Sequence, residues 1–407
     1  MASQVENIVP FEQLFSESTD HFLLPFQEIV KPDIVNGMHL TFELTDKLRE
    51  EKISPVLRLA RPEDAEEIVH IYLDIYKGTY PYKEMESVEE VREMIQSNEY
   101  EWLMFMDSEG TTVGCFTYQL DFEKRRGYMR GFNLKPYYQG KIDAVKACVG
   151  SMIGVWSTYH DRISMWYCEN RTAHSKSQYI AQVCGIKPIA FFPCKDVFLN
   201  KVESDLMQIV YKKEAIKDQR CKETPRILPE IKSCYSYADN RYQLGDVIIT
   251  SPRVRLNLRE IVKLKHTLEL EIEKENFGYE SFTITFKHRD SYLKFLYTPQ
   301  VQNFEKIEYH ITRLEELFVF LQEFKRIAHE IGIRYYECFV SAYEPEHQKV
   351  FVDAGFIPRG YVPSWMYHPD TDEFEDHIVF NYFKGDIDKN IRLIDEGWDL
   401  LKVLDVL

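Results

Sequence analysis

The stretch NLKPYYQGKIDAVKAC, residues 133–148, joins the end of one predicted strand to the start of a predicted helix. The strand-like run stops at a proline, the turn passes two tyrosines and a glycine, and apolar residues then recur from Ile142 at helical spacing. A helix N-terminus presents unpaired N–H groups and the positive end of the helix dipole, so this turn suits a phosphate. Lys135, Lys141 and Lys146 add positive charge there. An ordinary strand-to-helix turn with solvated lysines is the alternative interpretation.

Composition narrows the class of protein. The chain has 407 residues, of which 44% are hydrophobic, and this length suits at least two folded domains. Its formal net charge is −16, and it has no basic tract, so we expect no nucleic-acid partner. The first residues lack a secretory signal pattern, and no apolar run is long enough to span a membrane. We therefore expect a cytoplasmic protein without a membrane partner.

The cysteines do not indicate a metal site. Eight are present, and none is spaced as CxxC or CxxxC from another. Several fall inside predicted strands or helices, where reduced buried thiols are common. We expect no zinc site and no disulfide framework.

Pattern changes divide the chain into four segments. Residues 1–54 form an N-terminal extension, 55–212 a first domain, 213–245 a charged linker with prolines, and 246–407 a second domain. The first domain reads as β-α-α-β-β-β-α-β-α-β-β. The second repeats the later elements of the first, as an internal repeat at the level of elements rather than residues. It ends in an amphipathic helix whose Leu and Val residues we expect to dock on a neighbour or a partner chain.

The element order, the opening LRLARPEDAEEIVHIY, the turn PYYQGKIDA and the later Cys184-Gly185-Ile186 together resemble the GNAT acyltransferase superfamily. The resemblance implies an α/β fold with a mixed sheet, present here as two GNAT-like folds in tandem. It also implies an N-acetyltransferase that moves an acetyl group from acetyl-CoA to the primary amine of a small molecule or peptide. An acidic surface favours a cationic acceptor.

The resemblance also implies which residues hold coenzyme A. In the family the turn reads Q/R-x-x-G-x-G/A, and its main-chain N–H groups bind the pyrophosphate. The matching residues are Gln139, Gly140, Lys141, Ile142, Asp143 and Ala144, with Ile142 standing where the family has its first glycine. The preceding strand residues Phe132, Asn133 and Leu134 would bond the pantetheine amides through their backbone. Asn170 would hydrogen-bond the cofactor or act as an ordinary cap.

Acid and base candidates are less regular. The family often has a tyrosine four residues before the glycine of the helix that ends near Gly185, and this chain has Ala181 there. Tyr179 is the remaining candidate acid, although its position predicts another helix face. Glu123 and Glu169 are candidate bases, acting directly or through water, and otherwise solvated strand-end residues.

The acceptor pocket is predicted from an aromatic loop. Tyr76, Tyr80 and Tyr82 lie in DIYKGTYPYKEM, which walls the acceptor pocket in the family, and surface packing is the other interpretation.

The second half has lost cofactor binding in this interpretation, because Glu315 and Glu316 open its matching helix and would repel a pyrophosphate. Its expected tasks are covering the first site, supplying acceptor-pocket residues such as Tyr361, Trp365 or Tyr367, or forming a homodimer. Two other functions stay open for the whole chain. One is a non-catalytic binding or sensor protein, which Ile142 and Ala181 favour, and the other is a structural or assembly role.

Overall fold

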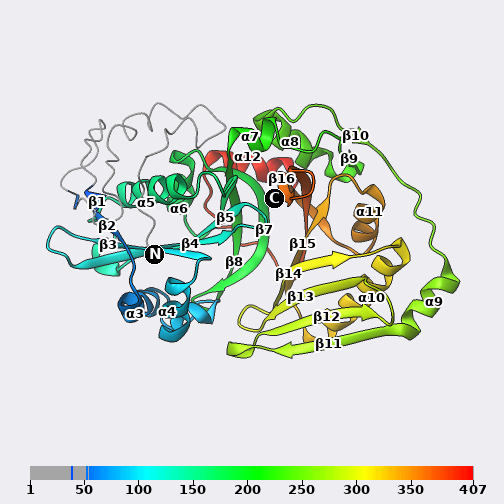
Figure 1. Cartoon of the computed structure of the whole chain (residues 1–407), viewed down its shortest axis with the longest axis horizontal. Helices are drawn as coiled ribbons and strands as arrows, with labels where there is room; N and C mark the ends of the chain where they lie inside the picture. The colour runs from blue at the N-terminus through cyan, green and yellow to red at the C-terminus, as the bar shows by residue number, and fades with distance from the viewer. Residues whose placement is uncertain (1–37, 40–51, 54, 407) are drawn as a thin grey trace. The chain divides into compact units, whose positions relative to one another are not determined.

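The computed structural model describes residues 38–39, 52–53 and 55–406 (Figure 1). The expected extension 1–54 therefore lies almost wholly outside the described residues. The chain divides into two compact units. Unit 1 is the described part of Met1–Pro188 with Phe198–Lys201 and Met207–Gln219, and unit 2 is Ile189–Val197, Val202–Leu206 and the described residues from Arg220 onward.

Unit 1 follows the predicted order of strands and helices. Its elements are β1 (Met38–His39), β2 (Val56–Leu59), α3 (Ala65–Tyr76), α4 (Val88–Gln96), β3 (Tyr100–Met106), β4 (Thr112–Asp121), β5 (Arg126–Leu134), α5 (Ala144–Thr158), β6 (Met165–Arg171) and α6 (Lys176–Val183), with the shared strands β7 (Lys187–Phe198) and β8 (Lys201–Tyr211) and the short α7 (Lys213–Lys217). The strands run side by side in the order β1-β2-β3-β4-β5-β6-β8-β7. The pairs from β1 to β5 are antiparallel and the β5–β6 pair is parallel, so this part is a mixed sheet.

Local sequence accounts for the first helices. Pro62 opens a short 3-10 turn before α3, where a fixed φ and a missing N–H are tolerated. Arg58 forms a two-point ion pair with Asp64 at 2.7 Å, and this pair fixes the strand against the start of the helix. Ser87 caps α4 by accepting the N–H of Glu90.

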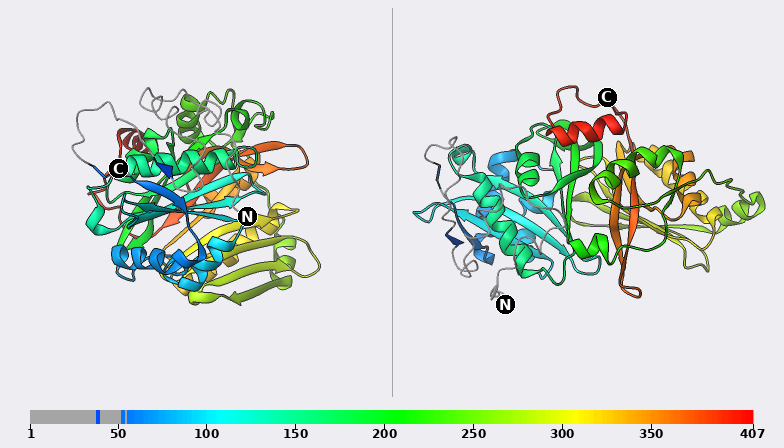
Figure 2. Two further views of the ribbon diagram at one scale, coloured as in Figure 1. Left: turned by 60° about the vertical axis from the view of Figure 1, so that its left-hand side comes forward. Right: turned by 90° about the horizontal axis from the view of Figure 1, so that it is seen from above.

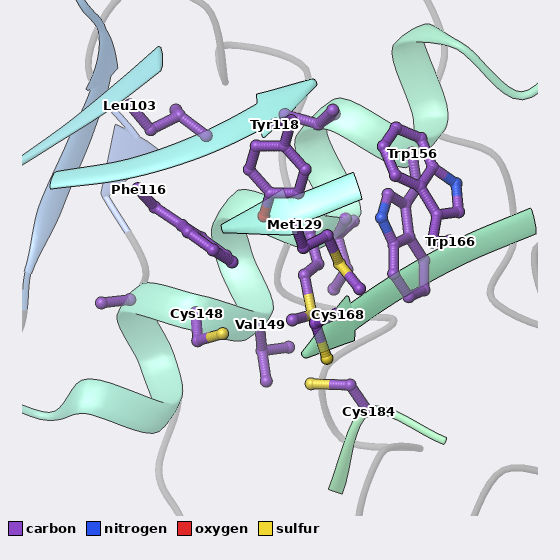
Figure 3. Packing of buried hydrophobic residues seen from close by; sticks show 14 of the residues in the cluster. Leu103, Phe116, Tyr118, Met129, Cys148, Val149, Trp156, Trp166, Cys168 and Cys184 are labelled. Carbon is purple, nitrogen blue, oxygen red and sulfur yellow. The ribbon is translucent and has the colours of Figure 1, made fainter. Parts of the chain in front are cut away.

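Helices cover both faces of the unit 1 sheet (Figures 1 and 2). The face under α3 and α4 buries a cluster rich in tyrosine, and the face under α5 and α6 buries the larger aliphatic and aromatic core. Figure 3 shows this second core, in which Trp156 of α5 stacks on Trp166 of β6 at 5.7 Å between ring centroids. Ile142 and Ala181 are buried within it.

A β-bulge interrupts β5. Thr117 of β4 pairs with Arg130, whereas Cys115, two residues earlier, pairs with Asn133, so β5 has one extra residue. Gly131 lies in the bulge with φ +68°, a left-handed conformation that glycine adopts without steric cost. A Cβ built on it would overlap the hydroxyl oxygen of Tyr72 and lie 3.2 Å from the ring carbon Cζ. The bulge therefore requires a glycine.

Unit 2 repeats this strand order. Its elements are β9 (Arg226–Ile227), α8 (Lys232–Tyr242), β10 (Ile248–Ile249), α9 (Leu258–Thr267), β11 (Leu268–Lys274), β12 (Glu280–Phe286), β13 (Tyr292–Thr298), β14 (Asn303–His310), α10 (Leu314–Ile331), β15 (Tyr335–Ser341), α11 (Pro345–Asp353), β16 (Ile357–His368), β17 (Glu373–Phe383) and α12 (Asp395–Val403). Strands β11-β12-β13-β14-β15-β17-β16 follow one another as β2-β3-β4-β5-β6-β8-β7 do in unit 1. A hairpin around Arg289 and Asp290 joins β12 to β13.

The segment expected as a linker over 213–245 is folded. It holds α7 and α8, and α8 buries Cys234, Tyr235, Ala238 and Tyr242. These residues recur at three- or four-residue spacing among the charged ones, and this pattern produces an amphipathic helix. High charge alone therefore misidentified the segment.

The C-terminal helix α12 packs on a neighbouring part of its own unit, which is one of the two outcomes expected for its apolar residues. Leu400 and Leu401 of α12 are buried with Phe191, Leu206 and Leu393, all within unit 2. The helix thus completes the core of its own unit. The cysteines agree with expectation, since all eight are free thiols and seven are buried.

We predict that Gly131→Ala lowers the free energy of unfolding by about 2–4 kcal/mol, because alanine adds left-handed strain and an overlap with Tyr72. Combining it with Tyr72→Phe should recover the overlap component, about 1–2 kcal/mol. Urea unfolding followed by tyrosine and tryptophan fluorescence measures both. Gly140→Ala is the control, because Gly140 has φ +81° and open space around the built Cβ. Equal stability of the single and double variants would contradict the packing argument.

Candidate functional site

The parallel ladder between β5 and β6 ends early. It contains three pairs, Arg126–Met165, Gly127–Trp166 and Tyr128–Tyr167, although both strands continue beyond them. The last pair stacks its two rings at 4.8 Å between centroids. Residues 129–134 of β5 thus have no strand partner on the β6 side, inside a sheet rather than at its edge.

The backbone beyond the bulge presents hydrogen-bonding groups on that open side. The N–H of Lys135 donates to the carbonyl of Val113 in β4 at 2.9 Å. Successive residues of a strand direct these groups to opposite sides, so the N–H and C=O of Leu134 point toward the side that β6 has left. The side chain of Gln139 reaches back to the Leu134 carbonyl at 3.2 Å. Of the predicted strand residues, Leu134 therefore offers its backbone most directly, whereas the Asn133 carbonyl lies against Gly114 of β4.

The turn after β5 partly uses its own amides. The N–H groups of Lys141 and Ile142 bond to Tyr138, and that of Asp143 bonds to Ile53. Among the described residues, none accepts from the N–H of Gly140 or Ala144. Gly140 is exposed and left-handed, and open space surrounds its Cα.

Charged side chains around the turn are arranged differently from the sequence expectation. Lys135 pairs with Glu67, and Lys141 lies 3.3 Å above the ring of Tyr137. Asp143 is buried at the N-cap of α5, where its carboxylate accepts the N–H of Lys146. A carboxylate thus occupies a main-chain N–H of the first turn of α5, that of Lys146, beside the amides predicted for a phosphate.

Ile142 is 1% exposed, and its side chain packs into the core. It replaces a glycine of the family turn without taking a left-handed φ, since it is absent from the positive-φ residues of the described chain. The isoleucine therefore serves as a core anchor for the start of α5, and only its backbone faces the turn.

The tyrosines predicted for the acceptor pocket lie together over the open side. Tyr76 and Tyr80 are buried with ring centroids 4.6 Å apart, and Tyr82 lies 6.0 Å from Tyr80. Phe198 completes the cluster at 5.9 Å from Tyr76. Burial raises the pKa of Tyr76 far enough to keep its hydroxyl neutral, and this hydroxyl donates to Asn133 Oδ1 at 3.2 Å.

Two arginines that the sequence analysis did not single out flank this cluster. The Arg130 guanidinium of β5 lies 5.0 Å from the Tyr82 ring centroid, and the Arg171 guanidinium of β6 lies 4.0 Å from that of Phe198. Burial alone would lower the pKa of Arg130, but Tyr80 and Glu84 outweigh it, so the pKa is raised and the charge persists. Alternation along a strand was the available signal, because Arg130 shares a face with Tyr128.

The β6 candidates lie on opposite faces. Glu169 is half-buried and shares its face with Tyr167 and Arg171, toward the tyrosine cluster. Asn170 points the other way, and its amide donates to Gln208 at 2.8 Å and to the Cys168 sulfur at 3.1 Å. Both donor hydrogens of Asn170 therefore have partners within the protein.

Glu123 and Tyr179 lie away from this region. Glu123 is exposed in the β4–β5 turn, at the paired end of β5 and opposite to the end where the strands part. Tyr179 is 47% exposed on α6, whereas Ala181 of the same helix is buried. Helical geometry predicted that Tyr179 and Ala181 face different ways. Neither Glu123 nor Tyr179 lies beside the part of β5 that lacks a partner on the β6 side.

The equivalent strands of unit 2, β14 and β15, pair again beyond their bulge. Unit 2 has a bulge between Lys294–Glu308 and Leu296–Glu305, in which Lys306 has φ +52°. The parallel β14–β15 ladder nevertheless continues past this bulge to Ile307 and Cys338. No comparable unpaired segment is left there.

The helix after β14 is closed by a carboxylate, as predicted. Glu316 is fully buried at the start of α10 and accepts the N–H of Thr312 and Arg313. Burial alone would raise its pKa, but these amides, Ser291 and Arg289 hold the pKa below its usual range. The three unit 2 residues predicted to contribute to the acceptor pocket have partners within unit 2. Tyr361 bonds to Asp376, and Trp365 stacks on Phe339. Tyr367 bonds to Asp372 in a hairpin.

Neither a metal centre nor a membrane span is present in the part of the chain that the structure describes. No group of three or more His, Cys, Asp or Glu residues there is arranged to hold a metal ion. No described helix is both long and apolar enough to cross a bilayer.

Comparison with known proteins gives remote structural likenesses. No protein-family model and no curated protein sequence matches the chain. A mutant of spermidine N-acetyltransferase from Vibrio cholerae is 14% identical, covering 39% of this chain and 94% of its own, with a TM-score of 0.34. The enzyme from the same organism in complex with CoA and spermine is 16% identical, with 38% and 94% coverage and a TM-score of 0.33. Ribosomal-protein-S5-alanine acetyltransferase from Vibrio fischeri is 16% identical, with 43% and 97% coverage and a TM-score of 0.33. Identities and scores of this size establish neither a family nor an activity for this chain.

We predict that Glu316→Gln lowers the free energy of unfolding by about 1–3 kcal/mol near neutral pH, because it weakens charge-assisted hydrogen bonds at a buried cap. A lowered folded-state pKa stabilises the protein above the usual glutamate pKa of 4.5, and this stabilisation is lost as pH falls through the lower folded value. The difference between wild type and variant should therefore disappear in acid. Urea unfolding at several pH values measures it. Glu330→Gln, at a position 58% exposed on the same helix, is the control, and an equal loss there would contradict the capping role.

Proposed function

We propose that unit 1 is an acyl-CoA-dependent N-acyltransferase that transfers an acetyl group to a primary amine of a small molecule or peptide. The observation that carries the proposal is the early end of the β5–β6 ladder, which leaves residues 129–134 paired with β4 on one side and without a strand partner on the β6 side. Main-chain N–H and C=O groups in such a place need partners, and an extended ligand with amide groups supplies them.

The order of features along the chain suits coenzyme A. The unpaired edge of β5 leads directly into the turn that ends at the N-terminus of α5. The pantetheine arm has two amides that match a strand edge, and the diphosphate matches the N–H groups of Gly140 and Ala144 at the turn. Gln139, Lys141, Ile142 and Asp143 shape this turn around those amides. The Asp143 carboxylate reduces the positive potential there, so we expect Lys141 and Lys146 to offset it.

The acyl thioester supplies an activated carbonyl: the amine nitrogen forms the new C–N bond, the C–S bond breaks, and the sulfur leaves as the CoA thiol. This chain's residues must take a proton from the ammonium group. Glu169 is the base we propose, directly or through water, because it lies on the face of β6 that meets the tyrosine cluster. Tyr76, Tyr80 and Tyr82 then form the wall of the acceptor pocket.

Unit 2 is proposed as a copy without cofactor binding. Its ladder has closed across the bulge, and a buried glutamate occupies its helix start. A non-catalytic sensor is the second candidate for the whole chain, favoured by the exposed position of Tyr179 and by Ala181, which leave no tyrosine acid on α6 near β5.

Gly140→Glu should abolish acetyl-CoA binding, because it places a negative charge beside the diphosphate, while Gly140→Lys should retain it. Both variants carry the same left-handed strain in the same open space, so only the sign of the charge differs. We expect acetyl-CoA, but not ATP, to raise the melting temperature of wild type and Gly140→Lys. Equal binding by the two variants would remove the proposed site.

Glu169→Gln should lower kcat by about 10²–10⁴, the usual loss when a general base is removed, with little change in acetyl-CoA affinity. Glu123→Gln, at the far end of β5, should leave both values unchanged. Release of free CoA thiol with a panel of amines measures turnover. An absence of turnover with every amine, together with retained acetyl-CoA binding, would favour the sensor.

A further inference from the structure

The face of unit 1 that meets α3 contains buried polar groups without acceptors. In the described chain no residue accepts from Tyr72 Oη, which is fully buried, or from Asn133 Nδ2, whose residue is 3% exposed. Thr117 Oγ1 and Trp102 Nε1 are also buried without a hydrogen-bond partner in the described chain. Each such group costs free energy unless a ligand or a water satisfies it.

These groups gather beside the bulge. The point where a Cβ of Gly131 would lie overlaps the Tyr72 hydroxyl and is 3.8 Å from Asn133 Nδ2, so the two donors lie near each other. Thr117 pairs with Arg130 across β4 and β5, which places the two side chains on one face. All of the unsatisfied atoms can donate a hydrogen bond.

Arg130 brings a charge to the same place. Its side chain is 12% exposed, and its one carboxylate partner in the described chain, Glu84, lies 3.5 Å away. A charge-assisted bond between guanidinium and carboxylate is usually about 2.7–2.9 Å long, so this pair leaves hydrogen-bonding capacity on the guanidinium. Arg130 and Asn133 of β5 and Tyr72 of α3 thus lie on one face of the sheet, and each keeps hydrogen-bonding capacity that the described chain does not use.

We propose that the acceptor amine carries a carboxylate, which Arg130 binds together with Asn133 and the Tyr72 hydroxyl. A carboxylate has only acceptor sites and matches the planar fork of an arginine. Glu169 of β6, across the gap, suits the ammonium group of the same molecule. The substrate class is therefore amino acids or peptides with a carboxylate near the reactive amine, rather than a polyamine. This inference rests on the proposed function, since it concerns the acceptor side of that site.

The test measures binding and not only turnover. Full-length protein saturated with CoA is titrated calorimetrically with matched pairs, an L-amino acid such as leucine and its neutral amide, together with a dipeptide, phosphoethanolamine and spermidine. We expect the acid to bind at least about tenfold more tightly than its amide, as loss of a charge-assisted bond implies. The dipeptide distinguishes a free amino acid from a peptide carboxylate. Preference for spermidine or phosphoethanolamine would overturn the inference.

Arg130→Met keeps the length of the side chain and removes its charge. It should abolish the difference between acid and amide and leave the affinity of the amide unchanged. An equal loss for both ligands would show a structural role and overturn the inference.

Tyr72→Phe tests the hydroxyl. It should weaken acid binding several-fold while the melting temperature of the ligand-free protein stays equal or rises, because an unsatisfied hydroxyl is removed. A lower melting temperature would mean that the hydroxyl holds a structural water and would overturn its part in carboxylate binding.

The two proposals fail in different ways. Acid binding that depends on Arg130, without thiol release from any amine, supports the carboxylate site and removes the transfer reaction. Equal thiol release with acids, amides and polyamines supports the transfer reaction and removes the carboxylate site.

Discussion

The structure of unit 1 depends on the point where β5 and β6 part. Hydrogen bonding holds the two strands together as far as the stacked pair Tyr128–Tyr167, and the extra residue of the bulge begins three residues later on β5. Beyond this pair β5 and β6 continue without pairing to each other, and the core beneath α5 remains packed (Figure 3). Unit 2 shows that a bulge alone does not open a sheet, since its β14–β15 ladder closes again at Ile307. The open segment is thus a specific feature of unit 1.

The two helices that follow the bulged strands differ in how their first turns are satisfied. At α10 the Glu316 carboxylate accepts two main-chain N–H groups, and Arg289 neutralises its charge, so nothing is left for an anion. At α5 the Asp143 carboxylate accepts one, from Lys146, and the turn before it keeps an exposed glycine. Glutamate has a longer side chain than aspartate and can reach back to close a helix start completely. The two carboxylates also stand at different positions: Glu316 is the third residue of α10 and reaches back to the amides before the helix, whereas Asp143 precedes α5 and accepts an amide of its first turn.

Periodicity predicted the elements of unit 1 in their observed order, because apolar residues on strands and helices repeat at two and 3.6 residues. It also predicted that Tyr179 and Ala181 face different ways and that acidic residues close α10. The pattern misidentified α8, since charged residues on one face concealed the apolar face. Arg130 and Tyr72 were missed for another reason. A buried tyrosine that packs and one that offers a hydroxyl have the same letter and spacing. Strand alternation puts Arg130 on the face of Tyr128, but it does not predict which groups cover that face.

Two buried tyrosines of unit 1 differ in the hydrogen bonding of their hydroxyls. Tyr118 and Tyr72 are both fully buried, and burial raises the pKa of both, so each keeps its proton. In the core under α5, Tyr118 bonds to Ser151 at 3.0 Å, which is what a hydroxyl placed for packing normally does. Beside the bulge, Tyr72 has no acceptor within the described chain, and phenylalanine would fill the same space without that cost. A sequence that keeps the hydroxyl there, together with three further unsatisfied donors on the same face, retains an energetic cost that a bound acceptor group would offset. Tyr72 and Tyr118 are thus equally buried and differ in whether the described chain supplies their hydroxyl with a hydrogen-bond partner.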